Sequence, residues 1–334
     1  MDEDTDVEAA YRLADEGGVR AADRLGAMTD VGVHGTRTTL GLLTPDTPAD
    51  AAVVGVELRG DTTDRVLVVF EDPDAVRHAA GDPDALPELG NVMVSGLVDG
   101  WADARETAID MAPPARPDFA EERVPSARTV IETDAGRITL LLEFVDDGPA
   151  GLRSSDRLAA DSAASAADRI GGLTGVETSV TVRELTYLPV EGLVGDVDDE
   201  PMVAVAARFD GPPDGYFLLL LDEASARAVA RQLAGTTALD SEGRDAIAEL
   251  GNVVAGGVVD SWADDLGTAI DISPPQVVHD IGEAVVDPVL VRLGRRQSFA
   301  ATFDAQVEAA GGRFDCRVCA ISEGEGLAPL APDT

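Results

Sequence analysis

Short apolar runs recur in two successive series along the chain, and segments with helical spacing of apolar residues accompany both series. Short runs rich in valine, leucine and phenylalanine are typical of buried strands. A short helix is expected after the second strand of each series, at 71–80 and 222–235. The predicted strands lie at 53–58, 65–70, 202–209 and 215–221, and the predicted hairpins lie at 128–144 and 297–321.

Two segments match each other so closely that they indicate an internal duplication. Residues 88–114 and 249–275 are identical at 17 of 27 positions without a gap. Residues 21–33 and 166–178 match again upstream, and the second copy has 16 more residues between the two landmarks. A repeat of this length indicates duplicated domains and not a solenoid.

The order of predicted elements in each copy is helix, strands, short helix, long helix and strands. Strands that follow one another in groups, without regular alternation with helices, favour an antiparallel sheet with helices on one face. The sequence therefore predicts an α+β fold in two duplicated units, residues 1–148 and 149–334. A polar stretch near 146–156 that contains glycine and proline would join them.

The charge of the chain is strongly negative, with 63 acidic residues against 25 basic ones and a formal net charge of −38. All the basic residues are arginine, and the acidic residues are spread along the chain. An evenly acidic surface on a foldable chain is typical of a protein kept soluble at very high salt, which predicts a halophilic source. No basic stripe is available for nucleic acid or an anionic membrane.

The sequence shows no pattern typical of a membrane span, a signal peptide or a cysteine-based site. No apolar run approaches the ~18 residues that would span a bilayer. The acidic start of the chain lacks the features of a signal peptide, so a cytoplasmic location is expected. Cys316 and Cys319 are the only cysteines. In a strand they would point to opposite faces, so neither a disulfide nor a metal site is expected.

The long helix of each copy carries one polar stripe. Asp245, Glu249 and Asn252 stand at positions i, i+4 and i+7, which lie within about 60° of one another around a helix. Asp84 and Ser241 are suitable N-cap residues for the two long helices. The first copy repeats the stripe, and a proline follows each asparagine by 23 residues, which gives the sets Asp84, Glu88, Asn91, Pro114 and Asp245, Glu249, Asn252, Pro275.

A glutamate and an asparagine three residues apart on an exposed helix are usually solvated surface. Here most other solvent-facing positions differ between the copies, whereas the Asp, Glu and Asn return at the same spacing with the proline behind them. The repetition therefore favours a shared chemical role.

The pattern of Asp or Ser, three residues, Glu, two residues, Asn, 22 residues and Pro resembles the signature of the CheC, CheX and FliY phosphatases, and both copies contain it in full. The stretch 173–189 is also similar to the segment that follows the first signature helix of CheC. The resemblance implies a CheC/CheX-like fold and a chemotaxis phosphatase of two-component signalling. Such an enzyme is a hydrolase that removes the aspartyl phosphate of a CheY-type response regulator.

The resemblance also implies roles for the residues of the signature. Asn91 and Asn252 would orient the attacking water, and Glu88 and Glu249 would pair with a lysine of the regulator. The aspartates would cap or line the docking face, and the prolines would shape the strand that follows. The regulator supplies Mg²⁺, so the chain needs no cofactor of its own.

One departure from the family is evident. A usual CheC is a single unit with two signature helices, but the aligned first helices here carry Arg12 and Asp15, and Arg157 and Ala160, in place of Glu and Asn. We expect two CheC-like units in tandem, each with only its second site. A non-catalytic chemotaxis adaptor that binds CheD or the response regulator is the alternative, and a flagellar-switch component of the FliY kind is the weaker third hypothesis.

Overall fold

The computed structural model describes residues 7–45, 47–60, 64–105, 108–117, 123–144, 152–195, 200–211, 214–281, 299–309 and 312–323. The chain divides into two compact units, unit 1 at Met1–Arg153 and unit 2 at Ser154–Thr334. The predicted boundary between residues 148 and 149 lies outside the described residues.

Unit 1 is a six-stranded antiparallel sheet with helices packed against it. Its strands follow the order β1-β5-β6-β3-β2-β4. The elements are α1 (Val7–Met28), β1 (Val33–Leu43), β2 (Ala52–Gly60), β3 (Arg65–Phe70), α2 (Pro73–Ala80), α3 (Ala85–Arg105), β4 (Ile109–Met111), β5 (Val124–Thr133) and β6 (Gly136–Glu143).

Unit 2 repeats this arrangement with additions. Its strands follow the order β7-β12-β13-β9-β8-β10, and β11 also pairs with β8. The elements are α4 (Leu152–Thr174), β7 (Thr178–Pro189), α5 (Val190–Gly195), β8 (Pro201–Asp210), β9 (Gly215–Asp222), α6 (Glu223–Ala234), α7 (Ser241–Leu266), β10 (Asp271–Ile272), β11 (Gln276–Ile281), β12 (Phe299–Ala309) and β13 (Gly312–Ser322).

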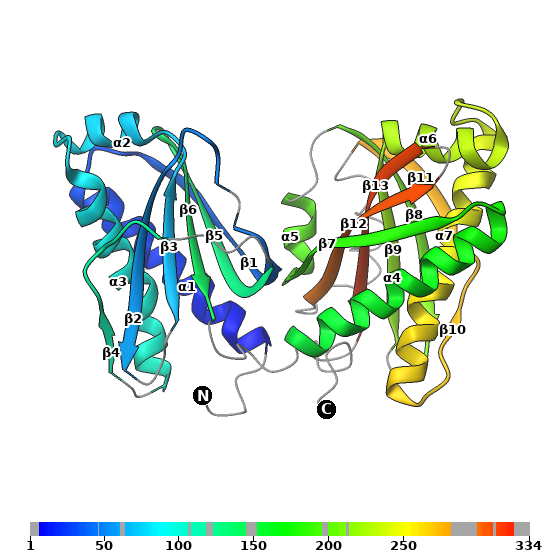
Figure 1. Ribbon diagram of the computed structural model, residues 1–334, viewed down its shortest axis with the longest axis horizontal. Coiled ribbons are helices and arrows are strands. Elements are labelled where there is room, and N and C mark those ends of the chain that lie inside the picture. Colours follow the sequence, from blue (N-terminus) through cyan, green and yellow to red (C-terminus); the bar gives the residue numbers. More distant parts are fainter. Residues whose placement is uncertain are drawn as a thin grey trace. The chain divides into compact units, whose positions relative to one another are not determined.

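The two sheets have the same strand order once equivalent strands are matched, and the long helices lie against one face of each sheet (Figure 1). This confirms the predicted fold class. Much of the extra length of unit 2 lies around its helix pair, because α6 has 12 residues against 8 in α2 and α7 has 26 against 21 in α3. The added elements α5 and β11 belong to unit 2.

The start of α7 corrects one expectation from the sequence. Ser241 is the first helical residue, and Asp240 is the N-cap, with its Oδ1 accepting from the backbone N–H of Gly243 at 3.3 Å. Aspartate is as good a cap as serine, and the helix begins one residue earlier than predicted. In unit 1, Asp84 directly precedes α3, and its own N–H donates to Oδ1 of Asp82 at 2.9 Å.

The two cysteines lie in β13 on opposite faces of the sheet, as expected from their spacing. Cys316 lines a small apolar cavity against α4 and α7 with Ala163 and Val258. Cys319 belongs to the cluster on the other face, with Leu188 and Leu218. Neither cysteine is in a disulfide, and burial raises the pKa of the Cys316 thiol to about 12.

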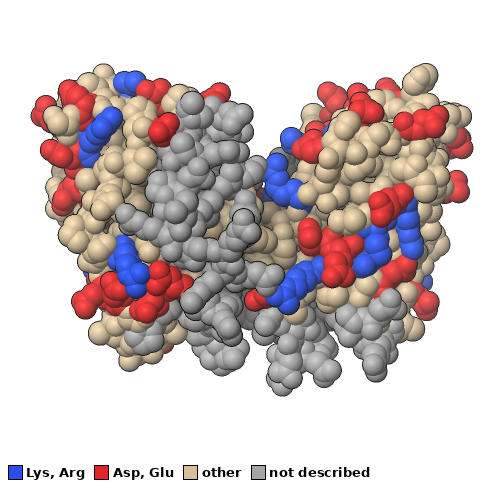
Figure 2. Space-filling view, turned by 180° about the vertical axis from the view of Figure 1, so that it is seen from behind, with Lys and Arg blue, Asp and Glu red and all other residues tan. Residues whose placement is uncertain are grey.

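The structure also shows how charge is distributed over the surface and whether any described helix could span a membrane. Figure 2 shows acidic side chains spread over the visible face of each unit, with arginines between them. Within the described ranges, no helix combines the length and apolar character that a membrane span requires.

Candidate functional site

The first turns of α3 determine the position of Asn91 relative to the sheet of unit 1. Pro87 is the third helical residue, a place where its missing N–H costs no intrahelical bond. Gly90 lies directly on β2, because a Cβ at this position would approach Cγ1 of Val54 to 2.8 Å. Asn91 follows at once, so its distance from the sheet is set by this close contact.

In unit 2, a glycine directly before the asparagine again packs closely on the sheet. A Cβ on Gly251 would clash with the side chain of Val205 in β8, and Asn252 follows. The two asparagines therefore stand at equivalent places on equivalent helices.

The predicted polar residues face outward and have no partner among the described residues. Glu88, Glu249 and Asn252 are exposed, and Asn91 is half-buried. No hydrogen bond or ion pair of these four side chains occurs within the described part of the chain. Their polar groups are thus available to a molecule that docks on the helix.

The signature proline of unit 1 sits between two stretches that pair with β2. Before it, β4 pairs with Leu58–Gly60, and the N–H of Ala112 donates to the carbonyl of Glu57 at 2.9 Å. After it, Ala115 and Gly55 exchange two backbone hydrogen bonds at 2.8 and 2.9 Å. Pro113 and Pro114 occupy the intervening bulge, where no ladder donor is required.

The corresponding bulge in unit 2 is anchored by a serine that sequence reasoning did not single out. The backbone N–H of Arg208 donates to Oγ of Ser273 at 2.8 Å, and the N–H of Ser273 donates to the carbonyl of Arg208 at 2.8 Å. Pro274 and Pro275 follow, and β11 then begins opposite Ala206.

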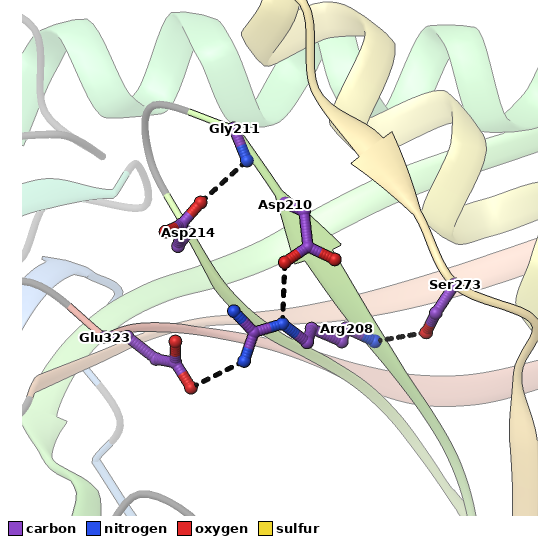
Figure 3. A network of polar contacts seen from close by, with 6 residues as sticks. All are labelled: Arg208, Asp210, Gly211, Asp214, Ser273 and Glu323. Carbon is purple, nitrogen blue, oxygen red and sulfur yellow. Dashed lines mark hydrogen bonds and ion pairs between the residues drawn. The ribbon is translucent and has the colours of Figure 1, made fainter.

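The side chain of Arg208 ties this anchor to neighbouring strands (Figure 3). Its Nε donates to Asp210 at 2.7 Å and its Nη1 to Glu323 at 2.9 Å, and the guanidinium lies 5.8 Å from the ring centre of Tyr216. The hydrogen bond to Asp210 raises the pKa of Arg208 above its ordinary value. The next turn closes with Gly211 donating to Asp214 at 2.7 Å. This network holds the strand end on which the proline segment rests.

The structure brings Asn91 and Pro114 together although 23 residues separate them. Both line an open groove of about 440 Å³ between α3 and the segment that contains β4, and Ser95, Asp99 and Asp110 also line it. Glu88 is not part of this lining, and stands one helical turn before Asn91. Glu88 and Asn91 thus form an outward-facing ridge along α3, and the groove lies beside Asn91.

An arginine from the first helix of each unit contacts the long helix beyond the asparagine. Arg24 of α1 donates to Oγ of Ser95 at 2.6 Å and pairs with Asp99 at 2.5 Å. In unit 2, Arg169 of α4 pairs with Asp260. Sequence reasoning missed this pair, although the motif Ala-Ala-Asp-Arg and the aspartate eight residues after each asparagine recur in both copies.

The first helices carry no glutamate–asparagine pair at the aligned positions. Arg12 and Asp15 lie in α1, where Arg12 forms an ion pair with Glu8. Arg157 and Ala160 lie in α4, and both are exposed. The described residues also contain no group of three or more His, Cys, Asp or Glu side chains placed to hold a metal ion.

The two segments that carry the candidate site also match a known protein family. The model of the CheC-like family matches residues 83–116 and 242–279, the two segments that carry the stripes and the prolines. A Halobacterium salinarum protein, provisionally named CheY-P phosphatase CheC1, is 31% identical over 190 residues, which cover 54% of this chain and 93% of that protein. The chain belongs to the CheC-like family.

Solved structures in this comparison each cover about half of the chain. FliY of Thermotoga maritima is 20% identical, covers 50% of this chain and 87% of its own, and gives a TM-score of 0.44. The chemotaxis protein CheX of Desulfovibrio desulfuricans is 14% identical, with 49% and 99% covered and a TM-score of 0.31.

Proposed function

We propose that this protein is a phosphatase that hydrolyses the aspartyl phosphate of a CheY-type chemotaxis response regulator in the cytoplasm. The observation that carries the proposal is the recurrence of an outward-facing glutamate and asparagine, without partners in the described chain, on the long helix of both units. The name of the Halobacterium salinarum relative supports the same substrate.

The chemistry needs little more than a well-placed water. An aspartyl phosphate is a reactive acyl phosphate, and water attack on phosphorus breaks the P–O bond to the carboxyl group, releasing aspartate and inorganic phosphate. Phosphoryl transfer of this kind depends mainly on positioning and on electrostatic stabilisation. The regulator brings Mg²⁺ as part of the substrate, so the chain itself supplies no metal.

Asn91 and Asn252 are suited to position that water. A carboxamide can accept one hydrogen bond from water and donate another, and it adds no negative charge next to the phosphoryl group. Glu88 and Glu249 stand one turn earlier on the same ridge, where each can form an ion pair with a lysine of the regulator. Asp84 and Asp245 line the docking face, and Pro114 and Pro275 shape its border.

The alternative, a non-catalytic adaptor, gains support from the first helices, since Arg12, Asp15, Arg157 and Ala160 occupy places where the family has catalytic side chains. Such a protein would act by binding CheD or the regulator. A pull-down with CheD next to a phosphate-release assay separates the two hypotheses.

The test of the proposal is the decay of a phosphorylated CheY-type regulator at high salt, with and without the protein. We expect the wild type to accelerate decay and the double variant Asn91→Ala/Asn252→Ala to leave decay at its spontaneous rate. The matched control is Asp15→Ala/Arg157→Ala, which changes the aligned face of α1 and α4 and should keep full activity. Wild-type protein that leaves the decay rate unchanged would remove the proposal.

A further inference from the structure

The outer edge of the sheet differs between the two units. In unit 2, β8 is paired along most of its outer side, with β10 at Phe209–Asp210 and β11 at Pro201–Ala206. In unit 1, the equivalent strand β2 pairs with β4 only at Leu58–Gly60, and then with Ala115 at Gly55 (Figure 1). Among the residues that the structure describes, the first residues of β2 therefore have no strand partner on the side where β8 pairs with β11.

Two residues explain why the pairing stops in unit 1. A Cβ on Gly55 would lie 3.0 Å from Cβ of Pro117, so the chain after Ala115 passes close over β2 at a position that has no side chain. Proline also has no N–H to continue a ladder. In unit 2 the equivalent of Pro117 is Val278, which pairs with Ala204 and continues β11 along the edge.

The alternation of an antiparallel ladder identifies the open groups. Gly55 directs its N–H and C=O outward to Ala115. Val53, two residues earlier, directs its own pair to the same side. The strand pairings of the described residues place no partner on that side of Val53.

A groove of about 620 Å³ lies along this open edge. Its lining includes Ala52–Val54 of β2, the loop residues 47–49 and 51, Pro87 at the start of α3, Pro114 and Arg116. The lining is made mostly of small apolar side chains, and Arg116 is the charged residue in it. Such an edge with a groove beside it is the usual receptor for strand addition.

We propose that the β2 edge of unit 1 binds an extended segment of a partner protein as an added antiparallel strand, paired with Ala52–Val54. The segment carries apolar side chains suited to the groove and an acidic residue that faces Arg116. Its backbone fills the place that β11 fills in unit 2.

Strand β11 serves as the internal template for this occupant. It has the sequence Gln-Val-Val-His-Asp-Ile, and Val277 and Val278 are half-buried. Val278 packs against the apolar cluster that contains Leu188 and Leu218. The open stretch of β2 pairs with β3 on its inner side in the same manner as β8 with β9. A segment with the pattern of β11 therefore meets a backbone edge of the same register in unit 1.

Amide hydrogen exchange of the full chain tests whether the edge is open. The N–H of Val53 should exchange rapidly, whereas that of Ala204, at the equivalent position, should be protected by β11. Protection of Val53 equal to that of Ala204 would overturn the proposal.

Strand addition itself is tested with a synthetic peptide of residues Gln276–Ile281. At millimolar peptide, the wild type should show NMR shifts at Ala52–Val54 and at least roughly ten-fold slower exchange of the Val53 amide. Val53→Pro, which lacks the outward N–H, should lose the shifts at Ala52 and Val54, and Val53→Ala should retain them. No shift in the wild type, or shifts that persist in Val53→Pro, would contradict strand pairing.

A second copy of this chain is the competing occupant. Sedimentation without peptide should give the same mass for wild type and Val53→Pro. A concentration-dependent dimer that Val53→Pro abolishes would overturn the assignment to a different protein.

Discussion

Gly96 of α3 lies against the backbone of Ala21 in α1, so close that a Cβ on Gly96 would stand 2.9 Å from the Ala21 nitrogen. Gly257 and Ala166 have the same relationship in unit 2, again at 2.9 Å. The long helix that carries the asparagine is thereby held against the first helix of its unit.

Gly96→Ala should destabilise unit 1 although alanine is the better helix former. The added methyl group has to push the two helices apart, and overpacking of this kind costs about 1–3 kcal/mol. Gly26→Ala in α1 is the matched control, because nothing lies within 4 Å of a Cβ there. It should be neutral or stabilising by up to about 1 kcal/mol. Denaturant unfolding gives both values, and equal effects would show that the close approach is absent.

Glu88→Gln with Glu249→Gln should separate docking from chemistry. Loss of an exposed ion pair costs about 1 kcal/mol, which raises KM for the phosphorylated regulator roughly five-fold. The value of kcat should stay nearly unchanged, because the asparagines still position water. A fall in kcat with constant KM would assign the glutamates a role in the reaction itself.

The acidic surface predicts stability that increases with salt. With a net charge of −38, repulsion is strong when the screening length is ~10 Å at 0.1 M salt and weak when it is ~3 Å at 1 M. The melting temperature should therefore rise steadily as KCl is raised into the molar range. A melting temperature independent of KCl would contradict the prediction of a halophilic protein.

The Cys316 thiol should make folding sensitive to alkaline pH. Burial raises its pKa from the ordinary 9.0 to about 12, so the folded state retains a proton that the unfolded chain loses. The resulting contribution to stability is complete below pH 9 and is lost as pH rises from 9 toward 12. The difference in unfolding free energy between wild type and Cys316→Ala should shrink over this range, and a constant difference would contradict the shift.

The repeat made much of the fold predictable. Matching the copies gave the order of elements, and strong apolar runs located β3, β9 and both terminal hairpins of the units within a few residues. Strand β1 was not located, because its first residues, from Val33 on, are exposed and only its second half is buried. The short strands β4 and β10 carry too few residues for a periodic pattern.

The candidate site was predictable in its helix residues and not in their surroundings. Spacing alone put Glu88 and Asn91 on one face. The contact of Arg24 with Ser95 and Asp99 depends on how α1 packs on α3, and no local pattern specifies it. The open edge of β2 had a visible signal in Pro117, which stands where the second copy has a valine.

The most direct measurement is the decay of the phosphorylated regulator in the presence of three variants. Asn91→Ala and Asn252→Ala alone should each leave roughly half of the acceleration, since each unit holds one complete glutamate–asparagine pair. The double variant should leave none while melting as the wild type does. Acceleration that survives in a correctly folded double variant would contradict water positioning by these two residues.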